Sequence, residues 1–393
     1  MNVFDSIYRD SKNNLIYGDL NIQRNINIDF GDGENNIVFI ARVATSVKIS
    51  FKGNNSLVFL ADWCHLGGKG IVIYSNSVCY LGKCTYIGEA TIWVSECKNF
   101  IIGDNCLFSS NIWFRTADQH MIYNMSTNTR INTGKSIYIG DHVWGGYGTS
   151  YLKGCFIASG SIIGNGSIVS GKIFRSNTIN AGVPCKEIKR NIFWIADTPD
   201  RSDFDRNTLE GYKFYNNEEF KYCYDRNNFL SPYTLEEKIN SFLLASEKLD
   251  FLYNTIYMNT NKNRFSYNKR NMKNHFIRAR LYTTAKARIR NHLAYKLGYI
   301  MIKNSKSFFG YIRMPYILLI VTLLHKIQVK KRRTFKDKFP PLESYPDYKE
   351  ALKEKECFAY KLGEALIQAH KDWYKGGYIR FLLKDIFKLK SEI

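Results

Sequence analysis

The sequence predicts a parallel β-helix in the N-terminal half of the chain and an α-helical domain in the C-terminal half. A six-residue repeat of apolar and small residues indicates the first, and helical spacing of apolar residues after about Pro199 indicates the second. With 393 residues the chain is long enough for more than one domain. We expect irregular early coils over residues 1–80, a regular repeat over 81–198 with a loop at 115–135, and a basic α-helical domain over 199–393.

The six-residue repeat is clearest in the second part of the expected β-helix. Steps of six from residue 139 give a mostly apolar set that is usually followed by a small residue: Ile139, Gly145, Tyr151, Ile157, Ile163 and Val169. Four positions after each member stands another small or branched residue. A six-residue period suits a coil with three short faces, about 18 residues per turn, stacked at about 4.8 Å.

The repeat is blurred at the start of the chain and interrupted once in the middle. NNIVFI, SVKISF, NSLVFL and GIVIYS are short β-like runs separated by Gly and Asn, and we interpret them as early coils. The rhythm stops at RTADQHMIYNMSTNTRINTGK and resumes at SIYIGDHVW. A polar segment that leaves a solenoid and re-enters it is a common place for function. It contains His120, the candidate proton acceptor.

The motifs IWFRTADQHMIYN, INTGKSIYIGDHVWGG, YLKGCFIASGSIIGNGSIVSG and NAGVPCKEIKRNIFW, in this order, resemble the hexapeptide-repeat acetyltransferases. Within that family they are most similar to O-acetyltransferases of bacterial surface glycans, including those that modify sialic and polysialic acid. The resemblance covers about residues 80–195. It implies a left-handed β-helix, a homotrimer, and acetyl-CoA as co-substrate along the coils. We expect no metal, because the nine cysteines show no zinc-type spacing.

The resemblance also implies roles for individual residues. His120 is the general base, Trp144 lines the acetyl-CoA site, and Gly182 and Pro184 form a turn near the adenine end. Imidazole suits the first role because a hydroxyl attacks a thioester poorly until a base accepts its proton. Further candidates for acetyl-CoA binding are Gly145, Gly146, Lys153, Ser161, Lys172 and Lys186. Candidates for the acceptor side are Arg115, Asp118, Asn124 and His142.

Three finer expectations concern the geometry of this site. Asp118 and Asn124 could orient the ring of His120. Backbone amides from Trp144 to Gly146 could stabilise the developing oxyanion, because glycine allows a close approach. Gly145 stands where the family usually has an aliphatic residue, which predicts a looser corner beside the thioester.

The net charge of +21 is concentrated in one segment. Residues 251–336 contain twenty Lys or Arg and no Asp or Glu. Such a surplus indicates a polyanionic partner, either an anionic membrane or an acidic glycan; we expect no nucleic acid, since none of its usual motifs is present. The run MPYILLIVTLL at 314–324 is too short to span a bilayer, and the first residues lack the pattern of a signal peptide. We expect a cytoplasmic protein, peripheral on the inner face of the membrane.

Three functions remain open at this point. The leading hypothesis is O-acetylation of a bacterial surface glycan, with sialic acid in lipooligosaccharide or capsule as the acceptor. The second is N-acetylation of a nucleotide-activated amino sugar, which could use the same base and co-substrate. The third is a non-catalytic glycan-binding scaffold, suggested by Gly145 and the irregular early coils.

Overall fold

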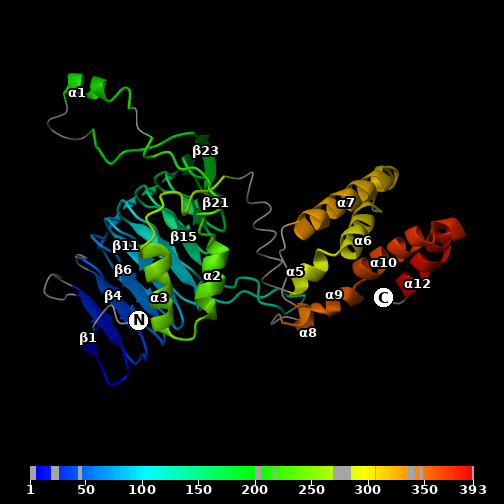
Figure 1. Cartoon of the computed structure of the whole chain (residues 1–393), viewed down its shortest axis with the longest axis horizontal. Helices are drawn as coiled ribbons and strands as arrows, with labels where there is room; N and C mark the ends of the chain where they lie inside the picture. Colours follow the sequence, from blue (N-terminus) through cyan, green and yellow to red (C-terminus); the bar gives the residue numbers. More distant parts are fainter. Residues whose placement is uncertain are drawn as a thin grey trace. The chain divides into compact units, whose positions relative to one another are not determined.

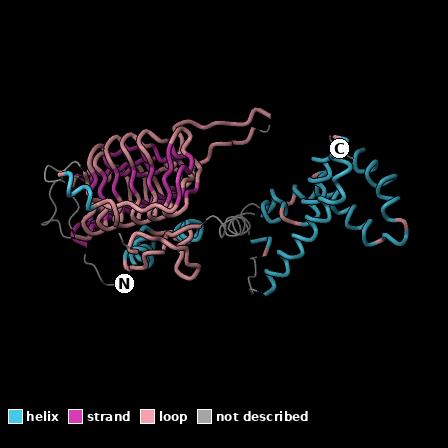
Figure 2. The backbone as a smooth tube through the Cα atoms, turned by 90° about the horizontal axis from the view of Figure 1, so that it is seen from above, coloured by secondary structure: helices cyan, strands magenta, loops and turns pink. Residues whose placement is uncertain are grey.

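The computed structural model describes residues 6–18, 26–42, 47–126, 128–199, 205–215, 218–268, 285–305, 307–334, 341–344 and 348–391. The chain divides into two compact units, residues 1–270 and 271–393. The first unit contains every described strand, and the second is helical (Figures 1 and 2).

The strands of the first unit form three sheets that run along the solenoid. The first contains, in spatial order, β1 (Ser6–Arg9), β2 (Leu15–Tyr17), β4 (Ile37–Ile40), β6 (Leu57–Leu60), β9 (Val78–Leu81), β12 (Asn99–Ile102), β15 (Ile137–Ile139), β18 (Phe156–Ile157) and β21 (Ile173–Phe174). The second contains β23 (Lys186–Arg190), β22 (Thr178–Ala181), β19 (Ile162–Ile163), β16 (Trp144–Gly145), β13 (Leu107–Phe108), β10 (Tyr86–Ile87) and β7 (His65–Leu66). The third contains β20 (Ile168–Val169), β17 (Ser150–Leu152), β14 (Ile112–Arg115), β11 (Ala90–Val94), β8 (Gly70–Ile73), β5 (Lys48–Phe51) and β3 (Asn27–Asp29).

These sheets confirm the left-handed parallel β-helix. Successive strands within a sheet are parallel and in register; for example, Trp144 pairs with Leu107 on one side and Ile162 on the other. Antiparallel pairs occur only at the two ends, β1–β2 and β22–β23, among the sheet strands described. All six members of the repeat set are buried, and the side chains of the five other than Gly145 belong to one continuous core.

The early coils are longer than the 18 residues expected from the repeat. In the first sheet, strands begin at Ile37, Leu57, Val78 and Asn99, which are 20 or 21 residues apart. The extra residues lie in corners where asparagines such as Asn35, Asn55 and Asn76 adopt positive φ angles. Asn tolerates this conformation better than most residues, so longer corners blur the six-residue pattern without breaking the stack.

Helices that follow the solenoid cover its first sheet (Figure 1). After α1 (Arg206–Gly211) come α2 (Pro232–Ser241), α3 (Ala245–Leu252) and the π-helical turn η2 (Tyr253–Tyr257). Strands β4, β6, β9 and β12 are buried on both faces, so their outer face needs an apolar cover. The rings of Phe59 and Tyr257, for example, lie 5.5 Å apart. Residues 218–268 therefore belong to the first compact unit, although the sequence led us to expect a helical domain from residue 199.

The second unit is built around a close pair of helices, α6 and α10. Its elements are α5 (Ala285–Arg290), α6 (Leu293–Asn304), α7 (Phe308–Thr334), η3 (Leu342–Ser344), α8 (Tyr348–Ala351), α9 (Lys353–Glu356), α10 (Phe358–Lys371), η4 (Trp373–Lys375), α11 (Gly377–Arg380), η5 (Phe381–Asp385) and α12 (Ile386–Ser391). A Cβ added to Gly298 would lie 1.7 Å from Ala359 O, and one added to Gly363 would lie 1.7 Å from Ala294 O. Glycine at these two positions therefore lets the helices touch backbone to backbone.

Candidate active site

The loop that carries His120 is an irregular hairpin projecting from the solenoid (Figure 2). It leaves after β14 and returns at β15, and Tyr123 and Arg130 pair across it as an antiparallel bridge. Ile131 N donates to Ile122 O at 2.9 Å, and Asn124 N donates to Thr129 O at 2.9 Å. The excursion predicted at 115–135 thus has a defined shape of its own.

Asn132 holds the two arms of this loop together. Its amide Nδ2 donates to His120 O at 2.7 Å and to Asp118 Oδ2 at 2.8 Å, and its Oδ1 accepts from Ile122 N at 2.8 Å. These bonds fix the backbone on both sides of His120. Asn132 does not stand out in the sequence, because its partners lie 10 to 14 residues away and no local motif marks it.

Two ion pairs tie the loop to the neighbouring coils. Lys153, which follows β17, binds Asp118 and donates to Asn132 O at 2.9 Å. Glu96 binds Arg130 and accepts from Gly134 N at 2.6 Å. The hydrogen bond from Lys153, together with that from Asn132, holds the pKa of the Asp118 carboxyl below its usual range. Lys153 therefore anchors the loop, which leaves it occupied rather than free for a CoA phosphate.

The ring of His120 is exposed and open to an incoming group. Within the described part of the chain only its backbone carbonyl is hydrogen-bonded, to Asn132. Asp118 is committed to Lys153 and Asn132, and the Asn124 side chain accepts from Ser126 N at 2.9 Å in a local turn. None of these bonds reaches the His120 ring, so the orienting role expected of Asp118 and Asn124 stays a prediction.

Trp144 and the two glycines after it form a rigid corner. Trp144 is 40% exposed, and its ring lies 5.9 Å from that of Trp194. Trp144 N and Gly146 N donate to Ser161 O and Ile163 O of the next coil, at 3.0 and 2.8 Å. Within one subunit the amides of Trp144 and Gly146 already serve the strand ladder, so they are not free to stabilise an oxyanion. For Gly145 N the expectation stays a prediction.

Gly145 does not loosen the corner as expected. It faces the core, where an added Cβ would lie 2.4 Å from both Phe108 Cδ1 and Tyr151 Oη. These two rings, 5.6 Å apart, fill the space that an aliphatic side chain would take. Gly146 is equally confined, since a Cβ there would lie 2.2 Å from Asn165 Oδ1. Both glycines are packing positions.

His142 is enclosed and is not available to an acceptor. Its ring lies 4.0 Å from Trp194 and 4.5 Å from Phe220 in two stacked contacts, and the residue is 6% exposed. Nε2 donates to Trp194 O at 2.9 Å, so this nitrogen carries its proton and cannot act as a base. Burial lowers the pKa of His142. The expectation that it lines the acceptor site is therefore not supported by its surroundings.

The remaining candidates divide by exposure. Ser161 is buried, and its hydroxyl donates to Arg175 O at 2.6 Å, which commits it to the corner. Arg115 donates from Nε to Ala117 O at 2.7 Å and lies 4.7 Å from the Trp93 ring. The exposed candidates lie near the end of the solenoid: Lys172, Gly182, Pro184 and Lys186. Residues 182–185 form the predicted turn, in which Gly182 has a φ of 102°.

A buried arginine from outside the repeat joins the coils that flank the loop. Arg264 donates to Asp141 Oδ1 and Oδ2, at 2.7 and 3.1 Å, and binds Asp104 Oδ2 at 2.7 Å. Asp104 precedes the loop and Asp141 follows it, and Asp104 N also donates to Asp141 Oδ1 at 2.7 Å. Arg264, 2% exposed, thus closes the stack across the insertion. In the sequence Arg264 is only one basic residue within a basic segment.

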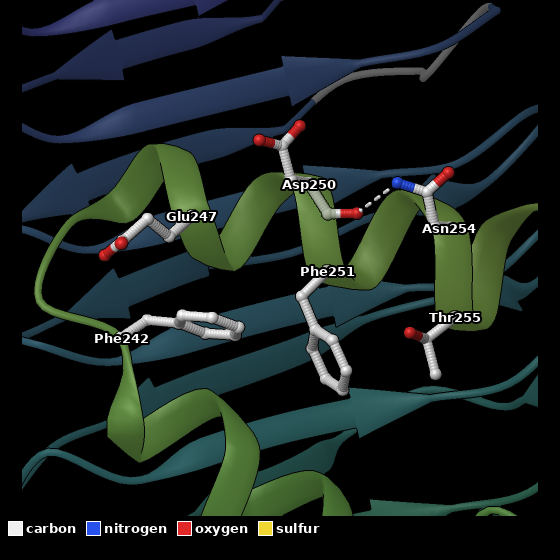
Figure 3. Close-up of a pocket in the computed structure, with 6 residues that line it drawn as sticks. All are labelled: Phe242, Glu247, Asp250, Phe251, Asn254 and Thr255. Atoms are coloured by element: carbon white, nitrogen blue, oxygen red, sulfur yellow. Dashed lines mark hydrogen bonds between the residues drawn. The ribbon is translucent and has the colours of Figure 1, made fainter. Parts of the chain in front are cut away.

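A hollow in the first unit offers fewer reactive side chains than the His120 loop. It measures about 400 Å³ and is lined by Phe242, Glu247, Asp250, Phe251, Asn254 and Thr255. Figure 3 shows Asn254 donating to the Asp250 carbonyl, at 2.8 Å, and Glu247 caps α3 through Leu243 N and Leu244 N. It lacks a histidine base. Among the described residues no three His, Cys, Asp or Glu side chains gather to hold a metal.

The chain is similar to known glycan acetyltransferases. It is 30% identical over 184 residues to the polysialic acid O-acetyltransferase of Neisseria meningitidis, covering 46% of this chain and 86% of that protein. It is 34% identical over 124 residues to the polysialic acid O-acetyltransferase of Escherichia coli O1:K1 / APEC, covering 32% of this chain and 40% of that protein. A crystal structure of the polySia-specific acetyltransferase NeuO matches with 31% identity and a TM-score of 0.42, covering 49% of this chain and 88% of that one.

The C-terminal half matches a different family, described as a domain of unknown function (DUF8374), over residues 209–393. That match includes the segment with Arg264, which completes the solenoid. The enzyme interpretation is confirmed, and the scaffold hypothesis gives way to it. The chain belongs to the hexapeptide-repeat acetyltransferases, the family of the polysialic acid O-acetyltransferases.

Proposed function

We propose that this acetyltransferase moves an acetyl group from acetyl-CoA to a hydroxyl of a bacterial surface glycan, with sialic acid in lipooligosaccharide or capsule as acceptor. The observation that carries the proposal is the loop itself. It presents an exposed imidazole, His120, while Asn132 and the two ion pairs fix its backbone. The names of the relatives, which specify polysialic acid, support the choice of acceptor.

In the proposed reaction His120 accepts the proton of the acceptor hydroxyl as its oxygen attacks the thioester carbonyl. The carbon–sulfur bond then breaks, and the imidazolium returns the proton to the leaving thiolate. Products are an acetyl ester and CoA, and no enzyme-bound acetyl group is needed. Trp144, half-exposed beside Trp194, offers an apolar wall for the thioester end. Lys172 and Lys186, both exposed, are candidates for CoA phosphates.

The proposed partners are an acidic glycan, two further copies in a homotrimer, and an anionic membrane surface for the basic segment. A trimer would let one subunit's loop meet the corner of its neighbour. The membrane contact was predicted for residues 251–336, of which 269–284, 306 and 335–336 lie outside the described residues. We place the protein in the cytoplasm, at the inner face of the membrane.

The test is CoA release from acetyl-CoA with sialylated oligosaccharides, neutral oligosaccharides and a nucleotide-activated amino sugar as separate acceptors. We expect release with the sialylated acceptor and a rate about 10²-fold lower for His120→Ala, since that is the usual contribution of a general base. His370→Ala, which removes another exposed histidine, should keep the wild-type rate. Release only with the amino sugar would move the function to N-acetylation, and a His120→Ala rate within a few-fold of wild type would remove the base assignment.

A further inference from the structure

Helix α7 of the second unit presents a continuous apolar face to solvent. Its exposed apolar side chains include Phe309, Ile312, Tyr316, Leu319, Ile320 and Leu323. With 3.6 residues per turn, these six positions fall within a stripe about 100° wide. The stripe is strongly exposed, with Tyr316 at 71% and Leu319 at 60%. Most apolar helix faces in water-soluble domains are covered, so a partner for this one is expected.

Helix α7 packs on one neighbour, and Ile312, Tyr316, Leu319, Ile320 and Leu323 stay exposed to solvent. Within the described residues of the second unit, α7 packs mainly on α6, while α6 packs on α10 (Figure 1). Its 27 residues extend well beyond the 12 residues of α6. The part of α7 that carries the stripe, residues 309–323, can lie along a flat surface.

The charge of α7 selects among possible partners. Phe308–Thr334 contains Arg313, Lys326, Lys330, Lys331, Arg332 and Arg333 and no acidic residue. A second copy docked on the same face would bring two strongly cationic helices together, at an electrostatic cost. A hydroxylated polysaccharide offers little hydrocarbon to cover Leu and Ile. An anionic lipid bilayer accepts both the apolar stripe and the cationic flank.

A spanning orientation is not indicated. No helix in the described part of the chain is long and apolar enough to cross a membrane. In α7 the apolar stretch is interrupted by Arg313 and Pro315 and gives way to a cationic end from Lys326. Tyr311 and Tyr316 add side chains that favour the region of lipid headgroups.

We propose that the α7 stripe is an interfacial docking surface for an anionic lipid bilayer. The apolar side chains enter the boundary between headgroups and acyl chains, and the exposed Arg313 and Lys326 contact lipid phosphates. This assigns the membrane contact proposed for the basic segment to one face of one helix. The inference depends on the proposed function only for its use, which is to hold the enzyme beside a membrane-bound acceptor.

The experiment is cosedimentation of the full-length protein with vesicles of phosphatidylglycerol and phosphatidylethanolamine, or of phosphatidylcholine alone. Wild type should bind the anionic vesicles at 0.1 M NaCl, much less at 0.5 M NaCl, and little to phosphatidylcholine. The double variant Leu319→Glu/Leu323→Glu should lower partitioning about tenfold or more, because two buried apolar side chains are lost. Both positions are exposed, so the fold should persist, and circular dichroism checks this.

A matched control separates the stripe from net charge. Phe214→Glu/Leu243→Glu makes the same charge change at two exposed apolar positions of the first unit, 89% and 82% exposed, and should bind within about twofold of wild type. Equal binding by both double variants, or no vesicle binding by wild type, overturns the proposal. The proposal is also overturned if Leu319→Glu/Leu323→Glu binds vesicles like wild type but no longer forms the wild-type oligomer in sedimentation velocity. The stripe would then be a contact between copies of the chain. CoA release with a soluble acceptor, measured on the same samples, reports separately on the proposed reaction.

Discussion

The corner around Trp144 and the loop around His120 are built in opposite ways. The corner is held by buried contacts: Arg264 with two carboxylates, and His142 between Trp194 and Phe220. The loop is held by partly exposed polar contacts through Asn132 and two ion pairs, and its histidine ring stays open. We call the corner the fixed half of the candidate site and the loop its adjustable half, because the loop backbone is held while the His120 side chain stays exposed. A rigid corner suits a constant co-substrate, and an adjustable loop suits a large acceptor.

The largest effect should come from breaking the fixed half at Arg264. Arg264→Met leaves the carboxylates of Asp104 and Asp141 buried without their cation, which typically costs about 3–5 kcal/mol. The measurement is the urea dependence of unfolding, followed by tryptophan fluorescence. Loss of activity should accompany loss of structure.

The control for Arg264 lies two residues away. Lys262 is exposed and donates only to the carbonyls of Glu218 and Glu219, at 3.1 Å each. Lys262→Met removes one charge from the same segment and should change stability by about 0.5 kcal/mol or less. If Arg264→Met were as mild as Lys262→Met, the coils flanking the loop would not depend on this ion pair.

The sequence predicted the position of the loop better than the contacts that hold the corner. The repeat predicted the solenoid and its inward positions, because a period of six appears in local order, and the interruption pointed to His120. Arg264 and Trp194 were missed as parts of the corner, because their partners lie 123 and 52 residues away. The meaning of Gly145 was also missed, since Phe108 compensates from a different coil. Contacts between coils depend on how the coils stack, and the linear sequence does not show this.

A smaller effect should follow from loosening the adjustable half at Asn132. Asn132→Ala removes the bonds to His120 O, Asp118 and Ile122 N while leaving every catalytic candidate in place. We expect kcat to fall about tenfold, because small misplacements of a base lower the rate, with little change in the KM for acetyl-CoA. Ser126→Ala, at the tip of the same loop, is the control and should be neutral. Equal loss in kcat for both variants, or a change confined to the KM for acetyl-CoA, would show that Asn132 does not position His120.

The smallest effect is on the pH dependence of the free energy of unfolding, and it tests whether His142 in the fixed half is shielded from water. Burial lowers the pKa of His142, whereas the same imidazole in the unfolded chain has a pKa of about 6.5. Below that value the unfolded state binds more protons than the folded state, so the free energy of unfolding falls as the pH falls. The contribution is fully present above about pH 6.5, and at pH 5.5 its loss is no more than about 1.4 kcal/mol.

His142→Asn isolates this contribution. Asn accepts the positive φ of 54° at this position, so the backbone can be kept while the titrating ring is removed. Wild type should lose more stability than the variant between pH 7.5 and pH 5.5, although the variant starts from a lower value because the stack with Trp194 and Phe220 is gone. Identical pH slopes would mean that His142 titrates as freely in the folded protein as in the unfolded chain. The corner would then open to water, and the contrast with the His120 loop would disappear.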